Sequence, residues 1–221
     1  MVTLALDAAA SIGTIAVLRD GVLTAERTVE MRSAADERYM PAVLAALAEA
    51  GAHPAAIDDI VCGAGPGSFT SLRVAGAIAK GLAMGVACPL FAVPSLALIV
   101  AASPETHAPG SRWLATLDAM RGDRYLALIM IGADGMVRSA ESLGLSPAAE
   151  IAARAAALDA RVIGPGEETD AAPHARGVVR CRGIIEAAGP VDLASWEPVY
   201  GRLAEAQVRR MRAADQAAGA R

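Results

Sequence analysis

Two short stretches of this chain resemble each other and are followed by the same kind of turn. Residues 4–8 have the sequence LALDA and residues 115–119 have the sequence ATLDA, so each is an apolar run that ends in Asp-Ala. Asp20-Gly21 follows the first stretch and Asp134-Gly135 follows the second, and Asp-Gly between apolar runs is a strong β-hairpin signal. The pattern predicts an internal duplication, in which a strand and a hairpin open each of two lobes.

The first half of the chain predicts the element order βββαβαβα. Strands are expected at 2–6, 14–18, 22–28, 60–63 and 89–93, and helices near 36–50, at 72–86 and from Ser95 onward. Pro104, Pro109 and Gly110 predict a linker. We therefore expect an α/β fold with mixed β-sheets flanked by helices. Its parts are an N-terminal lobe at 1–104, a smaller, degenerate C-terminal lobe at 111–200, and a C-terminal helix and tail at 201–221.

The composition favours a soluble protein whose helices pack closely on sheets. Hydrophobic residues make up 54% of the chain but aromatic residues only 3%, and the formal net charge is −4. That charge does not supply the basic face that autonomous binding of nucleic acid needs, so any RNA would be held by another protein. The apolar run at 90–102 is interrupted by Pro94 and is too short to span a bilayer. With a strand in place of a secretory signal at the N-terminus, we expect a cytoplasmic location and no membrane partner.

Neither the cysteines nor the histidines have the spacing of a metal site. The cysteines are far apart, odd in number and set among apolar residues, which predicts reduced core thiols: Cys62, Cys88 and Cys181. The histidines are unpaired and close to prolines, which predicts solvated loop positions: His53, His107 and His174. We therefore expect no metal to be bound.

The run GPGSFTSLRV at 65–74 joins a predicted strand to a predicted helix. Gly65 and Gly67 permit backbone angles closed to other residues, and Ser68, Thr70 or Ser71 can cap the helix. Such a corner can aim unpaired N–H groups at an anion, which makes Gly65, Gly67 and Ser68 candidate cofactor-binding residues. The run matches neither GxxxxGK[ST] nor GxGxxG, so an ordinary tight turn is the alternative.

The helix after this corner has features that call for a close partner. Arg73 falls in its first turn, where the macrodipole disfavours a cation unless an anion or a partner carboxylate offsets it. Gly76, Gly81 and Gly85 each cost about 0.5–1 kcal/mol relative to alanine in a helix interior. With interleaved alanines they leave almost no side-chain bulk, which suits close approach of another helix, from this chain or from a partner.

Four sequence blocks carry a resemblance to a known family. They are LALDAAAS at the start, GAGPGSFTSLRVAGAIAKGLAMG in the middle, LDAMRGDRYLA at the second lobe, and EPVYGRLAEAQ near the end. The chain resembles the TsaB (YeaZ) family of bacterial tRNA threonylcarbamoyladenosine biosynthesis proteins. That family belongs to the TsaD-like branch of the actin, sugar kinase and heat-shock ATPase superfamily. The resemblance implies two duplicated RNase H-like, actin-like lobes, between which active members of the superfamily bind ATP.

The resemblance also implies a function. TsaB proteins are non-catalytic partners of TsaD, which transfers a threonylcarbamoyl group to the adenosine 3′ of the anticodon in tRNAs reading codons that begin with A; the ATPase TsaE joins them. The chain would be a scaffold and activator with no catalytic residues, binding no cofactor alone, with ATP or ADP entering only in the complex. Strand-end carboxylates help position magnesium in active relatives, so Asp7 is a further cofactor candidate, although a structural role for Asp7 and Asp118 is expected.

By resemblance, the partner surface is formed by the two helices of the first lobe, and it can also form a homodimer when TsaD is absent. The residues expected there are Met40, Val43, Leu44, Leu47, Arg73, Gly76, Ala77 and Lys80. These positions can instead pack on the chain's own sheet. Near the C-terminus, Glu205, Arg209, Arg210 and Arg212 predict a solvated helix end. The shared motif at 197–200, EPVY, has no chemical role that the sequence indicates.

Two functions of other classes remain open from the residues. A small-molecule kinase of the same superfamily would turn over ATP and carry more polar loops after Asp7 and Asp118. A metal-dependent peptidase would need a cluster of metal ligands. Both rank below the scaffold interpretation.

Overall fold

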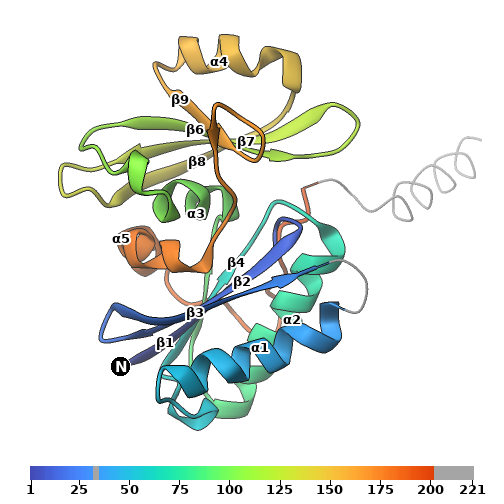
Figure 1. Ribbon diagram of the computed structural model, residues 1–221, viewed down its shortest axis with the longest axis vertical. Helices are drawn as coiled ribbons and strands as arrows, with labels where there is room; N and C mark the ends of the chain where they lie inside the picture. The colour runs from blue at the N-terminus through green and yellow to red at the C-terminus, as the bar shows by residue number, and fades with distance from the viewer. Residues whose placement is uncertain (32–34, 202–221) are drawn as a thin grey trace, which may run out of the picture.

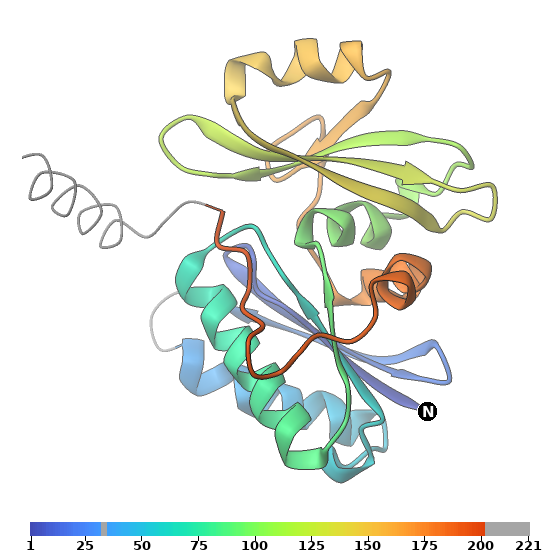
Figure 2. The same ribbon diagram turned by 180° about the vertical axis from the view of Figure 1, so that it is seen from behind.

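Two five-stranded sheets form the framework of the computed structural model, which describes residues 1–31 and 35–201 (Figures 1 and 2). The first sheet contains β1 (Val2–Asp7), β2 (Ile12–Arg19), β3 (Val22–Glu30), β4 (Asp59–Gly63) and β5 (Leu90–Val93). The second contains β6 (Arg112–Asp118), β7 (Asp123–Ile131), β8 (Val137–Pro147), β9 (Arg161–Gly164) and β10 (Thr169–Asp170). The α-helices are α1 (Ala35–Glu49), α2 (Phe69–Val86), α3 (Ser95–Ala102), α4 (Ile151–Ala157) and α5 (Val178–Ala188). Short 3₁₀ helices lie at Pro54–Ala56, Pro104–Thr106, Ala148–Glu150 and Ala175–Gly177.

The two sheets have the same topology. The strand order is β3-β2-β1-β4-β5 in the first and, read from the opposite edge, β8-β7-β6-β9-β10 in the second. β1 runs antiparallel to β2 and parallel to β4, and β6 pairs in the same two ways with β7 and β9. The expected α/β fold with two mixed sheets flanked by helices is confirmed, and the shared topology is what an internal duplication predicts.

The first half follows the expected order of elements, and its first hairpin has the expected turn. Asp20 and Gly21 connect β2 to β3 with φ of 51° and 80°. Two consecutive residues with positive φ are the requirement of a type I′ turn, which matches the twist of the paired strands. The largest difference lies at α2, which begins at Phe69 rather than at residue 72.

Helices and sheets alternate in layers, which Figures 1 and 2 show from opposite sides. α1 and α2 cover the outer face of the first sheet, α3 and α5 lie between the sheets, and α4 covers the outer face of the second sheet. Every residue of α3 is buried, as expected for a helix that is apolar on all sides. One hydrophobic cluster contains residues of both sheets, α3 and α5, so the two halves share a core.

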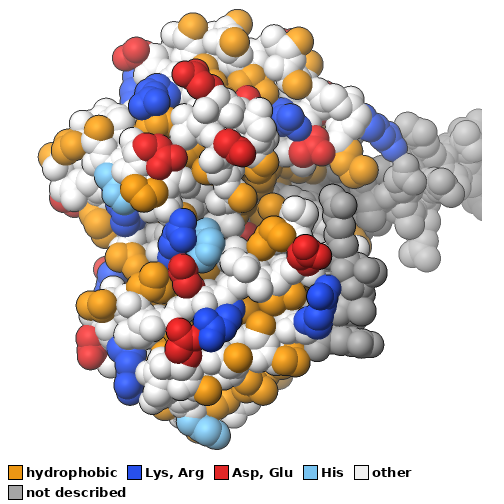
Figure 3. Space-filling model, viewed as in Figure 1, with side chains coloured by type: hydrophobic (Ala, Val, Ile, Leu, Met, Phe, Trp, Pro, Cys, Tyr) orange, Lys and Arg blue, Asp and Glu red, His pale blue; other side chains and the backbone are white. Residues whose placement is uncertain are grey.

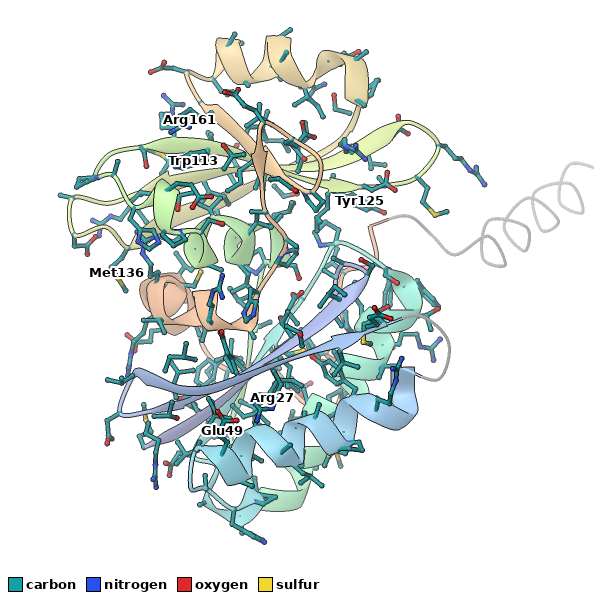
Figure 4. The ribbon with its side chains drawn as sticks, viewed as in Figure 1. Arg27, Glu49, Trp113, Tyr125, Met136 and Arg161 are labelled. Atoms are coloured by element: carbon teal, nitrogen blue, oxygen red, sulfur yellow. The ribbon has the colours of Figure 1, made fainter. Side chains whose placement is uncertain are left out.

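Polar contacts also join neighbouring elements. Arg27 on β3 forms an ion pair with Glu49 in the last turn of α1, and the Arg161 guanidinium lies 4.5 Å from the ring centroid of buried Trp113 (Figure 4). None of the helices in the described ranges is long and apolar enough to cross a bilayer.

The chain returns to the first lobe after α5. Residues 190–201, which we call the strap, run along α2, as Figure 2 shows in red. Val191 N–H donates to Leu90 O at 2.8 Å, and Pro190 forms an antiparallel bridge with Phe91 at the edge of β5. The strap therefore lies against the first lobe, although the sequence assigns it to the second. Residues 202–221, with Glu205 and the arginines at 209, 210 and 212, lie outside the described residues.

Candidate functional site

The corner between β4 and α2 is held by the chain itself. Gly65 has a φ of +86°, which glycine adopts without strain, and the peptide bond from Gly65 to Pro66 is cis. Gly65 N–H donates to Ser95 Oγ at 3.0 Å, and Ser68 N–H donates to Ala9 O at 2.8 Å. A Cβ at Gly67 would overlap the backbone of Ala9. Two amides of this corner that the sequence offers to an anion are therefore engaged by protein acceptors.

Polar side chains at the start of α2 have partners other than those that the sequence predicts. Ser68 is the N-cap residue, as expected, but its hydroxyl makes no capping bond and lies 2.9 Å from Ser71 Oγ. Arg73 is exposed, and its guanidinium lies 5.4 Å from the ring centroid of Phe69. The guanidinium therefore has an aromatic contact within the chain. Because α2 begins at Phe69, Arg73 is the fifth residue of the helix and lies past the first turn, where the macrodipole most disfavours a cation.

The EPVY motif of the strap packs on the same corner. Val199 N–H donates to Ala64 O at 2.7 Å, and the Tyr200 ring lies 4.6 Å from the Phe69 ring, centroid to centroid. From the second sheet, the hydroxyl of Tyr125 donates to Tyr200 O at 3.4 Å (Figure 4). The motif therefore joins the corner to the second sheet, a role that no local pattern in the sequence indicates.

The strap also provides the close approach that the glycine-rich helix predicts. A Cβ at Gly76 would meet the Pro198 ring at 3.0 Å, and Lys80 Nζ donates to Trp196 O at 2.9 Å. Gly81 and Gly85 are exposed and have open space around them. The segment that packs against the first of these three glycines thus belongs to this chain and is irregular rather than helical.

Asp7, the last residue of β1, is fully buried. Its Oδ2 accepts a hydrogen bond from Ser95 Oγ at 2.5 Å, and its Oδ1 accepts one from Ala9 N–H at 3.0 Å. A Cβ at Gly63 would overlap this carboxylate, so the neighbouring strand approaches it closely. Burial raises the pKa of Asp7 to about 6, although both hydrogen bonds act to lower it. The carboxylate is therefore enclosed by its own lobe.

Asp118, at the equivalent end of β6, has a different environment. Its side chain is 65% exposed and accepts from Arg124 Nη1 at 2.9 Å and from Met120 N–H at 3.1 Å. Glu167 lies 3.7 Å from Arg124 Nε and accepts from Thr116 Oγ1 at 2.9 Å. The strand-end aspartates of the two lobes thus both make structural hydrogen bonds, but one is buried and the other faces solvent.

The residues expected at a partner surface divide into inner and outer sets. Val43 and Leu47 are buried in the core beneath the first sheet, Gly76 is buried under the strap, and Met40 and Lys80 are partly buried. The outer set is exposed and consists of Leu44 on α1 with Arg73 and Ala77 on α2. Met84, which is 69% exposed on α2, extends this outer face and was not among the expected residues. The apolar side of an amphipathic helix faces its own core first, which explains the placement of Val43 and Leu47.

Two of the histidines cap short helices. His53 Nδ1 accepts from Ala55 N–H at 3.3 Å, and His174 Nδ1 accepts from Arg176 N–H at 3.2 Å. His53 and His107 are exposed, whereas His174 is partly buried, and burial lowers its pKa. Within residues 1–31 and 35–201 there is no group of three or more His, Cys, Asp or Glu that could hold a metal. All three cysteines are buried free thiols, as predicted.

The fold and this site define a class of protein. Two lobes of identical sheet topology, each with an aspartate ending its central strand, form the architecture of the actin-like ATPase superfamily. Residues 30–157 match the family described as "TsaD: tRNA N6-adenosine threonylcarbamoyltransferase". The chain belongs to this family, and the expected resemblance to its TsaB (YeaZ) members is confirmed.

Individual relatives agree with this assignment. The Escherichia coli tRNA threonylcarbamoyladenosine biosynthesis protein TsaB is 33% identical over 124 residues, covering 56% of this chain and 53% of that protein. A solved Pseudomonas aeruginosa structure, described as an uncharacterized protein with similarity to peptidase YeaZ, is 27% identical with a TM-score of 0.77, and covers 91% of this chain and 99% of that one. A second structure, YeaZ from Pseudomonas aeruginosa, is 25% identical with a TM-score of 0.70, covering 90% and 99%. The chain spans about half the length of the curated TsaB relatives that it matches.

Proposed function

We propose that this chain is a non-catalytic scaffold and activator subunit in the biosynthesis of threonylcarbamoyladenosine on tRNA. In this proposal it supports threonylcarbamoyl transfer to the adenosine 3′ of the anticodon in tRNAs reading codons that begin with A. Membership of the TsaD family and similarity to proteins named TsaB support the pathway. The observation that carries the non-catalytic role is the burial of Asp7, whose two carboxylate oxygens are engaged by Ser95 and Ala9.

The environment of the corner supports the proposal that the chain alone binds no nucleotide. A phosphate at this corner would need free backbone amides, whereas Gly65 N–H and Ser68 N–H already have acceptors within the chain. We place any ATP or ADP in the assembled complex.

The partners in this proposal are a TsaD-like subunit and a TsaE-like ATPase. The outer face of α1 and α2 would contact the TsaD-like subunit through Leu44, Arg73 and Ala77, and a second copy of the chain would use the same face when that subunit is absent. Figure 3 shows acidic and basic side chains interspersed on the face in view, and the formal net charge is −4. These features support contact with tRNA only through the complex. We place that complex in the cytoplasm.

The test is reconstitution of threonylcarbamoyl transfer to tRNA. TsaD, TsaE and the enzyme that forms threonylcarbamoyl-adenylate are combined with and without this chain, and ATP hydrolysis by the chain alone is measured in parallel. We expect modification to require the chain and the chain alone to hydrolyse no ATP. If tRNA is modified equally well with and without the chain, and the isolated chain hydrolyses ATP, the alternative function as a small-molecule kinase would be supported instead.

A pair of matched variants tests the partner surface. Leu44→Glu places a carboxylate on the outer face of α1, where the leucine is 44% exposed. Met130→Glu makes the same kind of change on β7 of the second lobe, where the methionine is 40% exposed. We expect Leu44→Glu to weaken pairing with the TsaD-like subunit about tenfold or more, because a charge in an apolar contact is poorly solvated. Equal effects of the two variants would contradict this placement of the surface.

The other two functions are not favoured. The matched family and the named relatives concern tRNA modification. The loop after Asp7 begins with three alanines, so it offers few polar side chains with which a kinase could bind phosphate.

A further inference from the structure

Two cationic side chains of α2 lie beside the strap, and within the described ranges neither forms an ion pair with a carboxylate. Arg73 is exposed, and its guanidinium lies over the Phe69 ring, 5.4 Å from the centroid. Lys80 is partly buried, and its Nζ donates to Trp196 O at 2.9 Å. Asp192, an exposed acid of the strap, accepts its hydrogen bonds from within the strap. A ring face and a carbonyl oxygen attract a cation but carry no net charge, so both positive charges remain to be neutralised.

The two cations lie on one side of α2. They are seven residues apart, which is close to two helical turns and separates them by about 10 Å along the helix axis. Between them lie Ala77, which is exposed, and Gly76, where a Cβ would meet the Pro198 ring. This side of the helix therefore presents two charges that are separated by surface with little side-chain bulk.

The strap, which runs along α2 in Figure 2, contacts both side chains or their neighbours. It holds Lys80 directly, through the carbonyl of Trp196, whose own side chain packs against the core of the first lobe. It holds Arg73 in two steps, because the Phe69 ring under the guanidinium lies 4.6 Å from the Tyr200 ring, centroid to centroid. The positions of both cations thus depend on the strap.

The second sheet fastens the end of the strap. The Tyr125 hydroxyl donates to Tyr200 O at 3.4 Å, and a Cβ at Gly201 would overlap the Tyr125 ring, which Figure 4 labels. Gly201 has a φ of +75°, which glycine adopts without strain. A side chain at this position would push the end of the strap off Tyr125, and Tyr200 with it. The second lobe therefore contributes, through the strap, to the position of Arg73.

We propose that the strap holds Arg73 and Lys80 in position to meet two carboxylates of the TsaD-like subunit. This inference rests on the proposed function and adds the chemistry of the partner, an acidic pair spaced about 10 Å apart. Charges of opposite sign on the two surfaces favour this pairing over others, and ion pairs that lose water at an interface are worth more than exposed ones. Side chains that the strap already holds also lose less conformational entropy when the partner arrives.

The first test removes single charges and measures pairing of the full chain with the TsaD-like subunit. Arg73→Gln and Lys80→Gln each remove one of the two cations, and Arg138→Gln removes the same charge from β8, where the arginine is exposed. The Kd is measured at about 50 mM and about 500 mM salt, since salt screens ion pairs. At the lower salt we expect each α2 variant to raise the Kd about fivefold or more and to reduce its dependence on salt, whereas Arg138→Gln should match wild type. Equal effects of all three variants would overturn the inference. Absence of pairing by the wild-type chain would overturn the proposed partner, and this inference with it.

The second test loosens the strap without touching either cation. Gly201→Ala and Gly166→Ala introduce the same backbone strain, because the two glycines have φ of 75° and 76°, but only the first new Cβ would meet the Tyr125 ring. We expect Gly201→Ala to raise the Kd about threefold or more, to reduce its dependence on salt, and to speed hydrogen exchange of Val199 N–H, which donates to Ala64 O. Gly166→Ala, in open space, should change none of these. Faster exchange at Val199 with an unchanged Kd would show that the strap does not position the cations and would overturn the inference, as would equal effects of the two variants.

Discussion

The buried carboxylate of Asp7 makes the stability of this protein depend on pH in a direction opposite to that of most acidic side chains. The pKa of Asp7 is raised from 3.8 to about 6 by burial, so the folded chain holds this proton to a higher pH than the unfolded chain does. The contribution of this group to stability is therefore complete below about pH 4 and is lost as the pH rises through about 6.

The substitution Asp7→Asn isolates this effect. The asparagine keeps an acceptor for Ala9 N–H, and its amide group can donate to Ser95 Oγ, but it has no charge to bury. With a pKa of 3.8 unfolded and about 6 folded, ionisation costs the wild-type chain about 1 kcal/mol at about pH 4.5 and about 3 kcal/mol at about pH 7.5. The stability of the variant relative to wild type should thus increase by about 2 kcal/mol between these two conditions.

Urea unfolding of both chains at the two pH values measures this difference. Titration of every other group cancels to first order, because the two chains share those groups. Ser95→Ala provides a second arm: it removes the donor that lowers the pKa of Asp7, so its destabilisation should be larger at the higher pH. A stability difference between wild type and Asp7→Asn that is the same at both pH values would refute the assignment of a raised pKa to this buried group.

Two further predictions concern the glycines of α2 and the strap, and each is measured by urea unfolding of the isolated chain. Gly81→Ala should stabilise the chain by about 0.5–1 kcal/mol, since glycine lowers helix stability by this amount and a Cβ at this position has open space. Gly76→Ala should bring no such gain, because its Cβ would lie 3.0 Å from the Pro198 ring. Tyr200→Ala should destabilise the chain by about 1–2 kcal/mol through loss of the ring contact with Phe69, whereas Tyr200→Phe keeps the ring and should cost little. Equal stability of the two glycine variants, or of the two tyrosine variants, would contradict these contacts.

Local patterns predicted most of the elements because each element carries its own signal. The Asp20-Gly21 turn and the apolar runs on either side specify a hairpin within a dozen residues. The helical period likewise identified the apolar side of α1. The period did not show which way that side faces. Val43 and Leu47, predicted at a partner surface, instead bury the apolar face of the first sheet.

The strap could not be predicted in the same way, because its position depends on contacts with residues far away in the sequence. It has no helical or strand period, and its place is set where Val199 meets Ala64 and Pro198 meets Gly76. The available signals were Gly76 inside the helix and the shared EPVY motif. They indicate that some segment approaches closely, but not which segment it is.

The structure gives a physical reason why duplicated lobes need not keep duplicated chemistry. At the carboxyl end of the first sheet, Ser95, the Ala9 carbonyl and the strap lie around Asp7 and the corner. Ser95 uses the carboxylate, Ala9 uses an amide of the corner, and the strap lies where a side chain at Gly65 would stand. At the equivalent end of the second sheet, Asp118 remains open to solvent beside Arg124. If the chain alone binds no nucleotide, as we propose, added metal ligands would not by themselves give the first lobe such a site, because the corner would also have to release its amides and the strap would have to move.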